Sequence, residues 1–240
     1  MKQVTDLQLK YEREIQDVYN AWRYRKEITR DEGNQKVDDI LHLAVSKKIF
    51  SQRDIDGYLQ RRDKMKDNKP RDHMKFLLDL EKSHVEEGIT FEYFINYLKE
   101  IDREPEWEDH GTDIGGFVMI ANFWERINSP NKPDKKVRWK RNGAYIQDIY
   151  VEVKNFGKDI WLKVNNLENY KNYNGQGAYL LIGFKNKYYF CKKNLVRLLL
   201  EKKSCAKDRA GKPSIIISND GSNAHFSLQD LIERKYIKQI

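Results

Sequence analysis

One short segment of the sequence places an acid and a lysine at a spacing that could do chemistry. Residues Tyr150 to Asn155 read YVEVKN, so Glu152 and Lys154 interrupt an otherwise apolar run. In a β-strand alternate side chains point to the same face, and Glu152 and Lys154 therefore share one face while Val151 and Val153 share the other. A carboxylate and an ammonium group on a buried strand call for a partner such as a metal ion or a phosphate. An ordinary ion pair between the two side chains is the alternative explanation.

A second acid is expected upstream, and two candidates qualify. Asp113 follows a polar loop and opens the apolar run DIGGF, as a buried metal ligand should. Asp134 stands in a Pro-Asp pair, 152 − 134 = 18 residues before Glu152. The hairpin signal Asn142-Gly143 would fold the chain so that position 134 lies opposite 151, beside Glu152. The segment around Asp134 is polar and rich in turn residues, which favours an exposed hairpin. We predict Asp113 as the first ligand and keep Asp134 as the alternative.

Together these segments resemble the PD-(D/E)xK nuclease superfamily, which includes restriction endonucleases. The resemblance implies that Asp113, Glu152 and Lys154 are the catalytic residues. It further implies that Asp113, Glu152 and the backbone of Val153 bind the metal. The implied core has the order helix, three strands, helix, strand (αβββαβ), and here it would cover roughly residues 90 to 200.

The chemistry that such residues support is hydrolysis of a phosphodiester bond. Two carboxylates, joined by the carbonyl oxygen of Val153, are hard oxygen ligands of the kind that Mg²⁺ prefers. A bound Mg²⁺ acts as a Lewis acid and lowers the pKa of a coordinated water. Lys154 would stabilise the negative charge that grows on the phosphate towards the transition state.

The fold that would position these residues is predicted to be mixed α/β (α+β), in two parts. Residues 1–89 are typical of helices and form a possible DNA-binding portion, and residues 90–240 would form the nuclease core. Gly33 and Gly88 are expected to break helices, and the helix after Gly88 would carry Glu92 or Glu100 towards the metal. Helices are predicted over about 4–22, 35–48, 70–88, 90–101, 159–173 and 194–202 and from 51 and 227 onwards, with strands over 177–184, 187–191 and 213–218.

The amino-acid composition is compatible with hydrolysis of phosphodiester bonds, and it argues against a disulfide-rich or zinc-binding protein. The 240 residues carry a formal net charge of +8, which suits a polyanionic partner. Two cysteines, Cys191 and Cys205, cannot form a disulfide framework or a four-cysteine metal site, and the five histidines show no zinc-binding spacing. The sequence contains no apolar run of about 20 residues and no apolar signal-peptide core at its start, so we expect a cytoplasmic protein.

We therefore expect a Mg²⁺-dependent DNA endonuclease, of the type II restriction class, that cuts double-stranded DNA at a specific sequence. A homodimer is expected because two sites related by a two-fold axis can cut both antiparallel strands. A structure-selective junction resolvase or phage recombination nuclease is the alternative among enzymes. The alternative outside enzymes is a regulator with a structural Glu152–Lys154 pair and a helix-turn-helix formed by the helix at about 35–48 and the helix from 51 onwards. It would present to DNA the side chains of Arg53, Gln60, Arg61 and Arg62.

Overall fold

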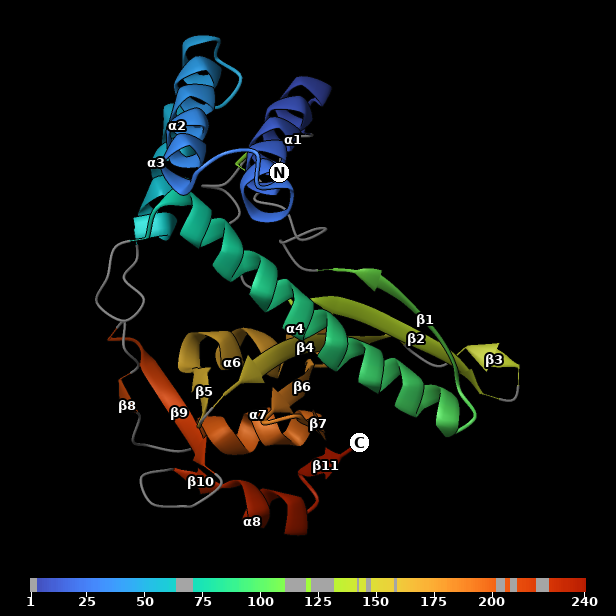
Figure 1. Cartoon of the computed structure of the whole chain (residues 1–240). Coiled ribbons are helices and arrows are strands. Elements are labelled where there is room, and N and C mark those ends of the chain that lie inside the picture. Colours follow the sequence, from blue (N-terminus) through green and yellow to red (C-terminus); the bar gives the residue numbers. More distant parts are fainter. Residues whose placement is uncertain are drawn as a thin grey trace. The chain divides into compact units, whose positions relative to one another are not determined.

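The computed structural model describes residues 4–63, 71–110, 120–121, 132–141, 143–145, 148–157, 159–201, 206–207, 211–218 and 225–240 (Figure 1). The chain divides into two compact units. Unit 1 comprises the described residues of Met1–His84 and Asp113–Ser129, and unit 2 those of Val85–Thr112 and Pro130–Ile240. The first division at 84/85 lies near the 89/90 division proposed from the sequence. Helices together with mixed sheets make this an α+β fold, as predicted.

Unit 1 is helical in its described part. Its elements are α1 Asp6–Asn20, the π-helical turn η1 Ala21–Arg25, α2 Arg30–Ser46, α3 Gln52–Asp63 and the first part of α4 His73–Glu100. Capping boxes start two of the helices, because Thr5 pairs with Gln8 and Thr29 pairs with Glu32. The buried core of unit 1 includes Tyr11, Ile15, Tyr19, Val37, Leu41, Tyr58, Met74 and Phe76.

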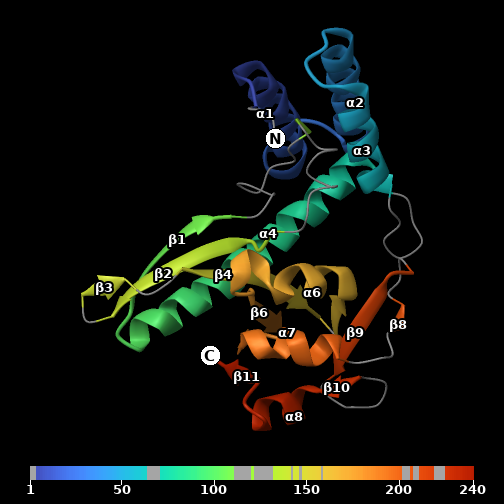
Figure 2. The ribbon, with the colours of Figure 1, turned by 180° about the vertical axis from the view of Figure 1, so that it is seen from behind.

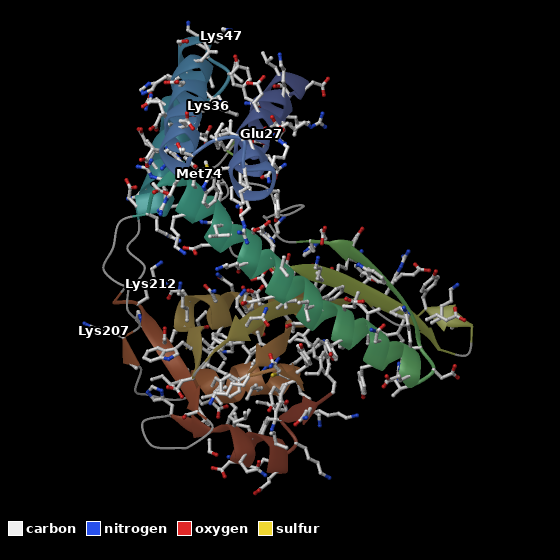
Figure 3. All side chains as sticks on the ribbon, viewed as in Figure 1. Glu27, Lys36, Lys47, Met74, Lys207 and Lys212 are labelled. Carbon is white, nitrogen blue, oxygen red and sulfur yellow. The ribbon has the colours of Figure 1, made fainter. Side chains whose placement is uncertain are left out.

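Two glycines that were expected to break helices lie inside them. The Thr29 cap starts α2 before Gly33, and a Cβ at Gly33 would lie 2.9 Å from Sδ of Met74, which is labelled in Figure 3. Glycine here permits close packing. The helices predicted for 70–88 and 90–101 are one helix, α4, which continues through Gly88. A glycine costs a helix only about 1 kcal/mol, and burial of apolar side chains further along α4 offsets it.

The main sheet of unit 2 has the strand order β1-β2-β4-β6-β7-β11, with β3 paired to β2. Its strands are β1 Glu104–Asp109, β2 Lys135–Arg141, β3 Ala144–Tyr145, β4 Ile149–Phe156, β6 Tyr179–Phe184, β7 Lys187–Cys191 and β11 Ile237–Gln239. The β4–β6 pair is parallel, and the other pairs of this sheet are antiparallel. The strands predicted near 177–184 and 187–191 are thereby confirmed as β6 and β7.

A smaller sheet and several helices complete unit 2. The second sheet joins β10 Phe226–Ser227, β9 Pro213–Ser218 and β5 Ile160–Lys163, with β8 Ala206–Lys207 also paired to β9. The helical segments are α6 Val164–Lys171, the 3-10 turn η2 Tyr173–Gly175, α7 Lys193–Leu200 and α8 Leu228–Glu233. The helix predicted over 159–173 is wrong in its first part, because residues 160–163 alternate buried and exposed and pair with β9 as a strand.

Helices cover both faces of β4. On one face, Val151 and Val153 pack with Phe91 and Phe94 from α4 (Figure 1). On the other face, the sheet packs with α6 and α7 (Figure 2). In chain order this part of unit 2 reads α4, β1, β2, β3, β4, β5, α6, β6, so β3 and β5 are additional to the order of helix, three strands, helix, strand that the resemblance implies. Among the described residues, no helix combines the length and the apolar character needed to cross a bilayer.

Candidate active site

Glu152 and Lys154 project from the same face of β4, as the strand pattern predicts. Both line a cavity of about 230 Å³ in unit 2, opposite residues of β5 and α6. Glu152 Oε1 lies 2.5 Å from Lys154 Nζ. One wall of the cavity is thus the charged face of β4. The opposite wall is formed by β5 and α6, which follow β4 in the chain.

The Glu152 carboxyl group is held in an unusual electrostatic environment. Its side chain is only 4% exposed. Burial raises the pKa of Glu152 to about 7, although the nearby Lys154 ammonium and a weaker interaction with the Tyr170 hydroxyl favour the charged form. Among the described residues, no group forms a hydrogen bond with Glu152 Oε2, which is buried. A buried carboxylate oxygen without a partner is costly, and it indicates a place where a ligand would be favourable.

Asp134 lies beside Glu152, immediately before β2. The β2–β4 register pairs Lys135 with Val151, so the next step of the register brings Asp134 to the level of Glu152. The amide of Val153 donates a 2.8 Å hydrogen bond to Asp134 Oδ2. The same oxygen lies 3.8 Å from Nζ of the lysine at position 154. The structure therefore brings Asp134, the alternative first acid, together with the acid and the lysine of β4.

The hairpin predicted at Asn142-Gly143 is present, but the register beyond it differs by one residue from the predicted one. Arg141 pairs with Ala144, which would place position 134 opposite 151 if it continued unchanged. The observed β2–β4 pairing has 135 opposite 151, so the register differs by one residue between the two pairings. The shift brings Asp134 level with position 152. Asp113, the predicted first ligand, lies outside the described residues.

Lys154 is surrounded by carboxylates. Burial disfavours its charge, yet Glu152, Asp134 and also Glu87 of α4 together raise the pKa of Lys154 above its ordinary value. The lysine is therefore an ammonium ion at neutral pH. The sequence pattern does not single out Glu87, because it predicts that a helix ends at Gly88.

The exposed side chains of Glu92 and Glu100, which were suggested as additional acids, lie further along the same helix. Glu87 is partly buried and interacts with the charge of Lys154. The helix acid that acts on the charge of Lys154 is thus at a position before the glycine. No apolar pattern marks this position, because the apolar residues on either side of it, Val85 and Ile89, are exposed.

The donor set fits a small divalent cation. Two adjacent carboxylates, one of them with a buried oxygen lacking a partner, are hard ligands of the kind that Mg²⁺ binds. The described residues hold no cluster of three or more histidine, cysteine or acidic side chains of metal-binding type. A cation held by Asp134 and Glu152 would therefore need further oxygens, and the carbonyl of Val153, which accepts a 3.0 Å hydrogen bond from Lys154, is the candidate from the same strand.

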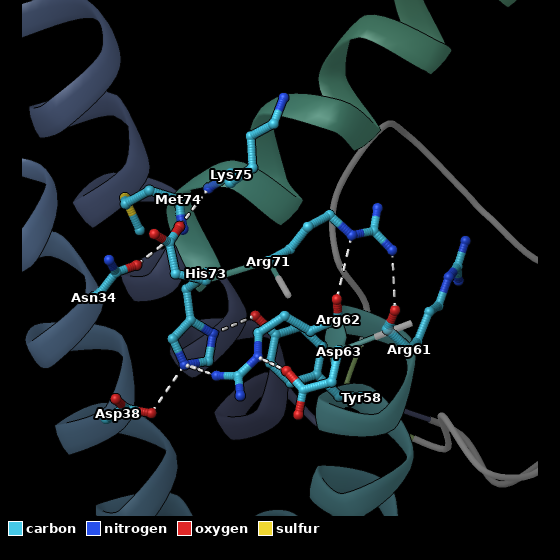
Figure 4. Close-up of polar contacts among 11 residues, drawn as sticks. Asn34, Asp38, Tyr58, Arg61, Arg62, Asp63, Arg71, His73, Met74 and Lys75 are labelled. Atoms are coloured by element: carbon cyan, nitrogen blue, oxygen red, sulfur yellow. Dashed lines mark hydrogen bonds and ion pairs between the residues drawn. The ribbon is translucent and has the colours of Figure 1, made fainter. Parts of the chain in front are cut away.

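A separate polar cluster lies within unit 1 and is shown in Figure 4. His73 is 1% exposed, and its Nδ1 lies 2.8 Å from the Tyr58 hydroxyl. Its Nε2 lies 2.8 Å from both Asp38 Oδ1 and Arg62 Nη1. Burial lowers the pKa of His73, and the charge of Arg62 acts in the same direction against the hydrogen bond to Asp38. Arg62 also pairs with Asp63, so its guanidinium is engaged within unit 1.

This engagement bears on the helix-turn-helix alternative. Helices α2 and α3 exist, as that alternative requires. However, Arg62, one of the four side chains expected on DNA, is only 20% exposed and faces His73 and Asp63.

Comparison of the chain with protein-family models gave no match, and a search among curated proteins gave no match either.

Proposed function

We propose that this protein is a Mg²⁺-dependent DNA endonuclease that hydrolyses phosphodiester bonds in double-stranded DNA. Asp134, Glu152 and Lys154 are its catalytic residues, with Asp134 in the role predicted for Asp113. The observation that carries the proposal is the meeting of these three side chains where the start of β2 lies beside the middle of β4, with Nζ of Lys154 at 2.5 Å from Glu152 and 3.8 Å from Asp134. Chemistry of this kind needs two acids and a cationic side chain around one phosphate.

In this proposal Asp134, Glu152 and the carbonyl of Val153 hold the cation. When bound, Mg²⁺ supplies a Lewis acid for the phosphate and lowers the pKa of a coordinated water. Glu152, whose pKa is about 7 without a cation, is held ionised when it is a ligand. Lys154 stays protonated beside the site and neutralises charge that develops on a phosphate oxygen. The amide of Val153 keeps one oxygen of Asp134 fixed in place.

The choice between a restriction endonuclease and a junction resolvase is drawn from the sequence. The net charge of +8 favours binding to DNA as a polyanion. A type II restriction endonuclease would act as a homodimer, because two copies of this site related by a two-fold axis can reach both strands of a duplex. The same site in a junction resolvase would cut branched DNA without sequence preference.

The test is incubation of the purified protein with plasmid and phage DNA, with Mg²⁺ or with EDTA, followed by gel electrophoresis. Discrete fragments that require Mg²⁺ and are absent for Glu152→Gln support a restriction endonuclease. Cleavage of a synthetic four-way junction, with linear and circular duplex left intact, supports the resolvase. DNA binding that is indifferent to Mg²⁺, with no cleavage of any substrate, contradicts the proposal and favours a DNA-binding regulator.

A further inference from the structure

Strand β5 presents an aromatic ring and a lysine to the candidate active site. Its residues alternate between buried and exposed, so Trp161 and Lys163 share the exposed side while Ile160 and Leu162 enter the core. Trp161 is 37% exposed. Trp161 and Lys163 line the same cavity of about 230 Å³ as the acid and the lysine of β4. A substrate bound in that cavity would therefore contact Trp161 and Lys163.

The indole of Trp161 differs from those of the other described tryptophans, each of which contacts an aromatic ring or a cation of the described residues. Trp22 packs against Tyr19, Trp107 against Phe91, and Trp139 lies under the guanidinium of Arg103. Among the described residues, no aromatic ring and no cation lies over Trp161. Its ring therefore offers an uncovered surface at the cavity, where a flat apolar group would remove it from water.

The group that fits this wall is a nucleobase with its phosphate. Every base has two flat π-faces, and stacking on an aromatic side chain strengthens binding by about 5- to 150-fold for each base. Lys163 lies two residues from Trp161, roughly 7 Å along the strand, and supplies a positive charge for an adjoining phosphate. In an intact duplex the neighbouring bases cover both faces of each base. Only a base that has left the stack can lie against the indole.

We propose that Trp161 stacks on an unpaired nucleobase next to the cleaved phosphate, and that Lys163 binds the adjoining phosphate. This inference rests on the proposed nuclease function and extends it to the form of the substrate. A duplex must lose pairing at one nucleotide before it can occupy the cavity. DNA that already has an unpaired nucleotide at that point avoids this cost and binds more tightly than a fully paired duplex.

The test compares the binding of two fluorescein-labelled duplexes by the full-length protein in EDTA, where cleavage is suppressed. One duplex is fully paired and the other carries a short bulge of unpaired nucleotides. Wild type should prefer the bulged duplex by about 5-fold or more, Trp161→Ala should lose this preference, and Trp161→Phe should keep most of it. Trp107→Ala is the matched control, because Trp107 is 51% exposed in the same unit but does not line this cavity.

The outcomes separate this inference from the proposed function. Equal binding of both duplexes by wild type, or an equal loss on both duplexes in Trp161→Ala, overturns the inference, and Mg²⁺-dependent cleavage by wild type would then still support the nuclease. A wild-type protein that binds neither duplex and cleaves no DNA overturns both. Circular dichroism shows whether Trp161→Ala folds. Where it does not, Trp161→Leu replaces it, and retention of the preference by this aliphatic variant overturns the inference as well.

Discussion

Val153 and Asp134 are joined across the β2–β4 pair by a 2.8 Å hydrogen bond from the Val153 amide to Asp134 Oδ2. One carboxylate oxygen is thereby fixed by the backbone of the strand that carries Glu152 and Lys154. This bond orients the Asp134 carboxyl group, so less conformational freedom is lost when a cation binds. The four residues lie in unit 2, and their arrangement leads to the first two predictions.

Asp134→Asn should abolish Mg²⁺-dependent cleavage, because it replaces a charged ligand by a neutral amide. The asparagine oxygen can still accept the hydrogen bond from Val153, so the fold should be retained. Asp113→Asn, made in parallel, should leave cleavage close to wild type if Asp134 is the first ligand. Rates of plasmid cleavage measure both variants. The opposite pattern, with loss only in Asp113→Asn, would restore Asp113 as the ligand and contradict the role given to Asp134.

Lys154→Met should lower the rate of cleavage by about 10²- to 10³-fold while DNA binding changes little, because it removes charge stabilisation of the transition state. Glu152→Gln should eliminate cleavage altogether. Asp148→Asn is a suitable control, since Asp148 lies just before the same strand and pairs with Lys136 at 3.1 Å. Single-turnover cleavage and circular dichroism would measure the effects. Loss of folding in both Lys154→Met and Glu152→Gln would mean that the pair is structural.

Gly183→Ala should destabilise the protein by about 1–3 kcal/mol, because of overpacking at β6. An added Cβ would lie 2.0 Å from Asn155 Oδ1 and 2.5 Å from Thr90 Oγ1, and these two side chains are hydrogen-bonded to each other at 2.5 Å. Gly88→Ala is the matched control, since a Cβ at Gly88 in α4 meets no atom within 4 Å. It should stabilise the helix by about 0.5–1 kcal/mol. Urea denaturation measures both, and equal stabilities would refute this explanation.

The stability of unit 1 should fall as the pH is lowered below about 6.5, because of His73. Burial lowers the pKa of His73 from its ordinary value of 6.5, so the unfolded chain takes up a proton before the folded chain does. The stabilisation is complete above 6.5 and is lost as the pH falls towards the folded-state pKa. Melting temperatures between pH 8 and pH 5 should therefore fall more steeply for wild type than for His73→Gln.

The control for this experiment is His42→Gln, because His42 is exposed on α2. This variant should follow the wild-type pH profile. A profile for His73→Gln that matches wild type would show that another group causes the loss of stability in acid.

Local sequence patterns were enough to predict the strand that carries Glu152 and Lys154 and the hairpin that brings the chain near Asp134 beside it. The alternation along β4 predicted that Glu152 and Lys154 share a face, and the hairpin signal predicted that the chain near Asp134 returns beside that strand. The one-residue shift between the β2–β3 and the β2–β4 registers could not be predicted, because the hairpin signal fixes only the pairing next to it.

Elements stabilised by distant partners escaped sequence analysis. Strand β1 reads EPEWED and has few residues that favour strands, yet it pairs with the cationic strand β2. Arg138 lies 2.8 Å from Glu106 and Lys136 lies 3.1 Å from Glu108 across this pair. Cross-strand charge pairs of this kind stabilise a strand only once its partner is present, so the local sequence does not reveal it. The proline of β1 is compatible with its place at the edge of the sheet.

The parallel pairing of β4 with β6 also sets an order of assembly. Asp134 reaches Glu152 after the chain has closed a loop of 152 − 134 = 18 residues through an antiparallel hairpin. The wall that holds Trp161 belongs to the crossover between the parallel strands β4 and β6, and its strand β5 pairs with β9, which comes later still in the chain. Closing the longer, non-local connection is the slower event. During synthesis and folding, the two acids should therefore meet before the cavity exists, so the proposed cation site would form earlier than the proposed site for DNA.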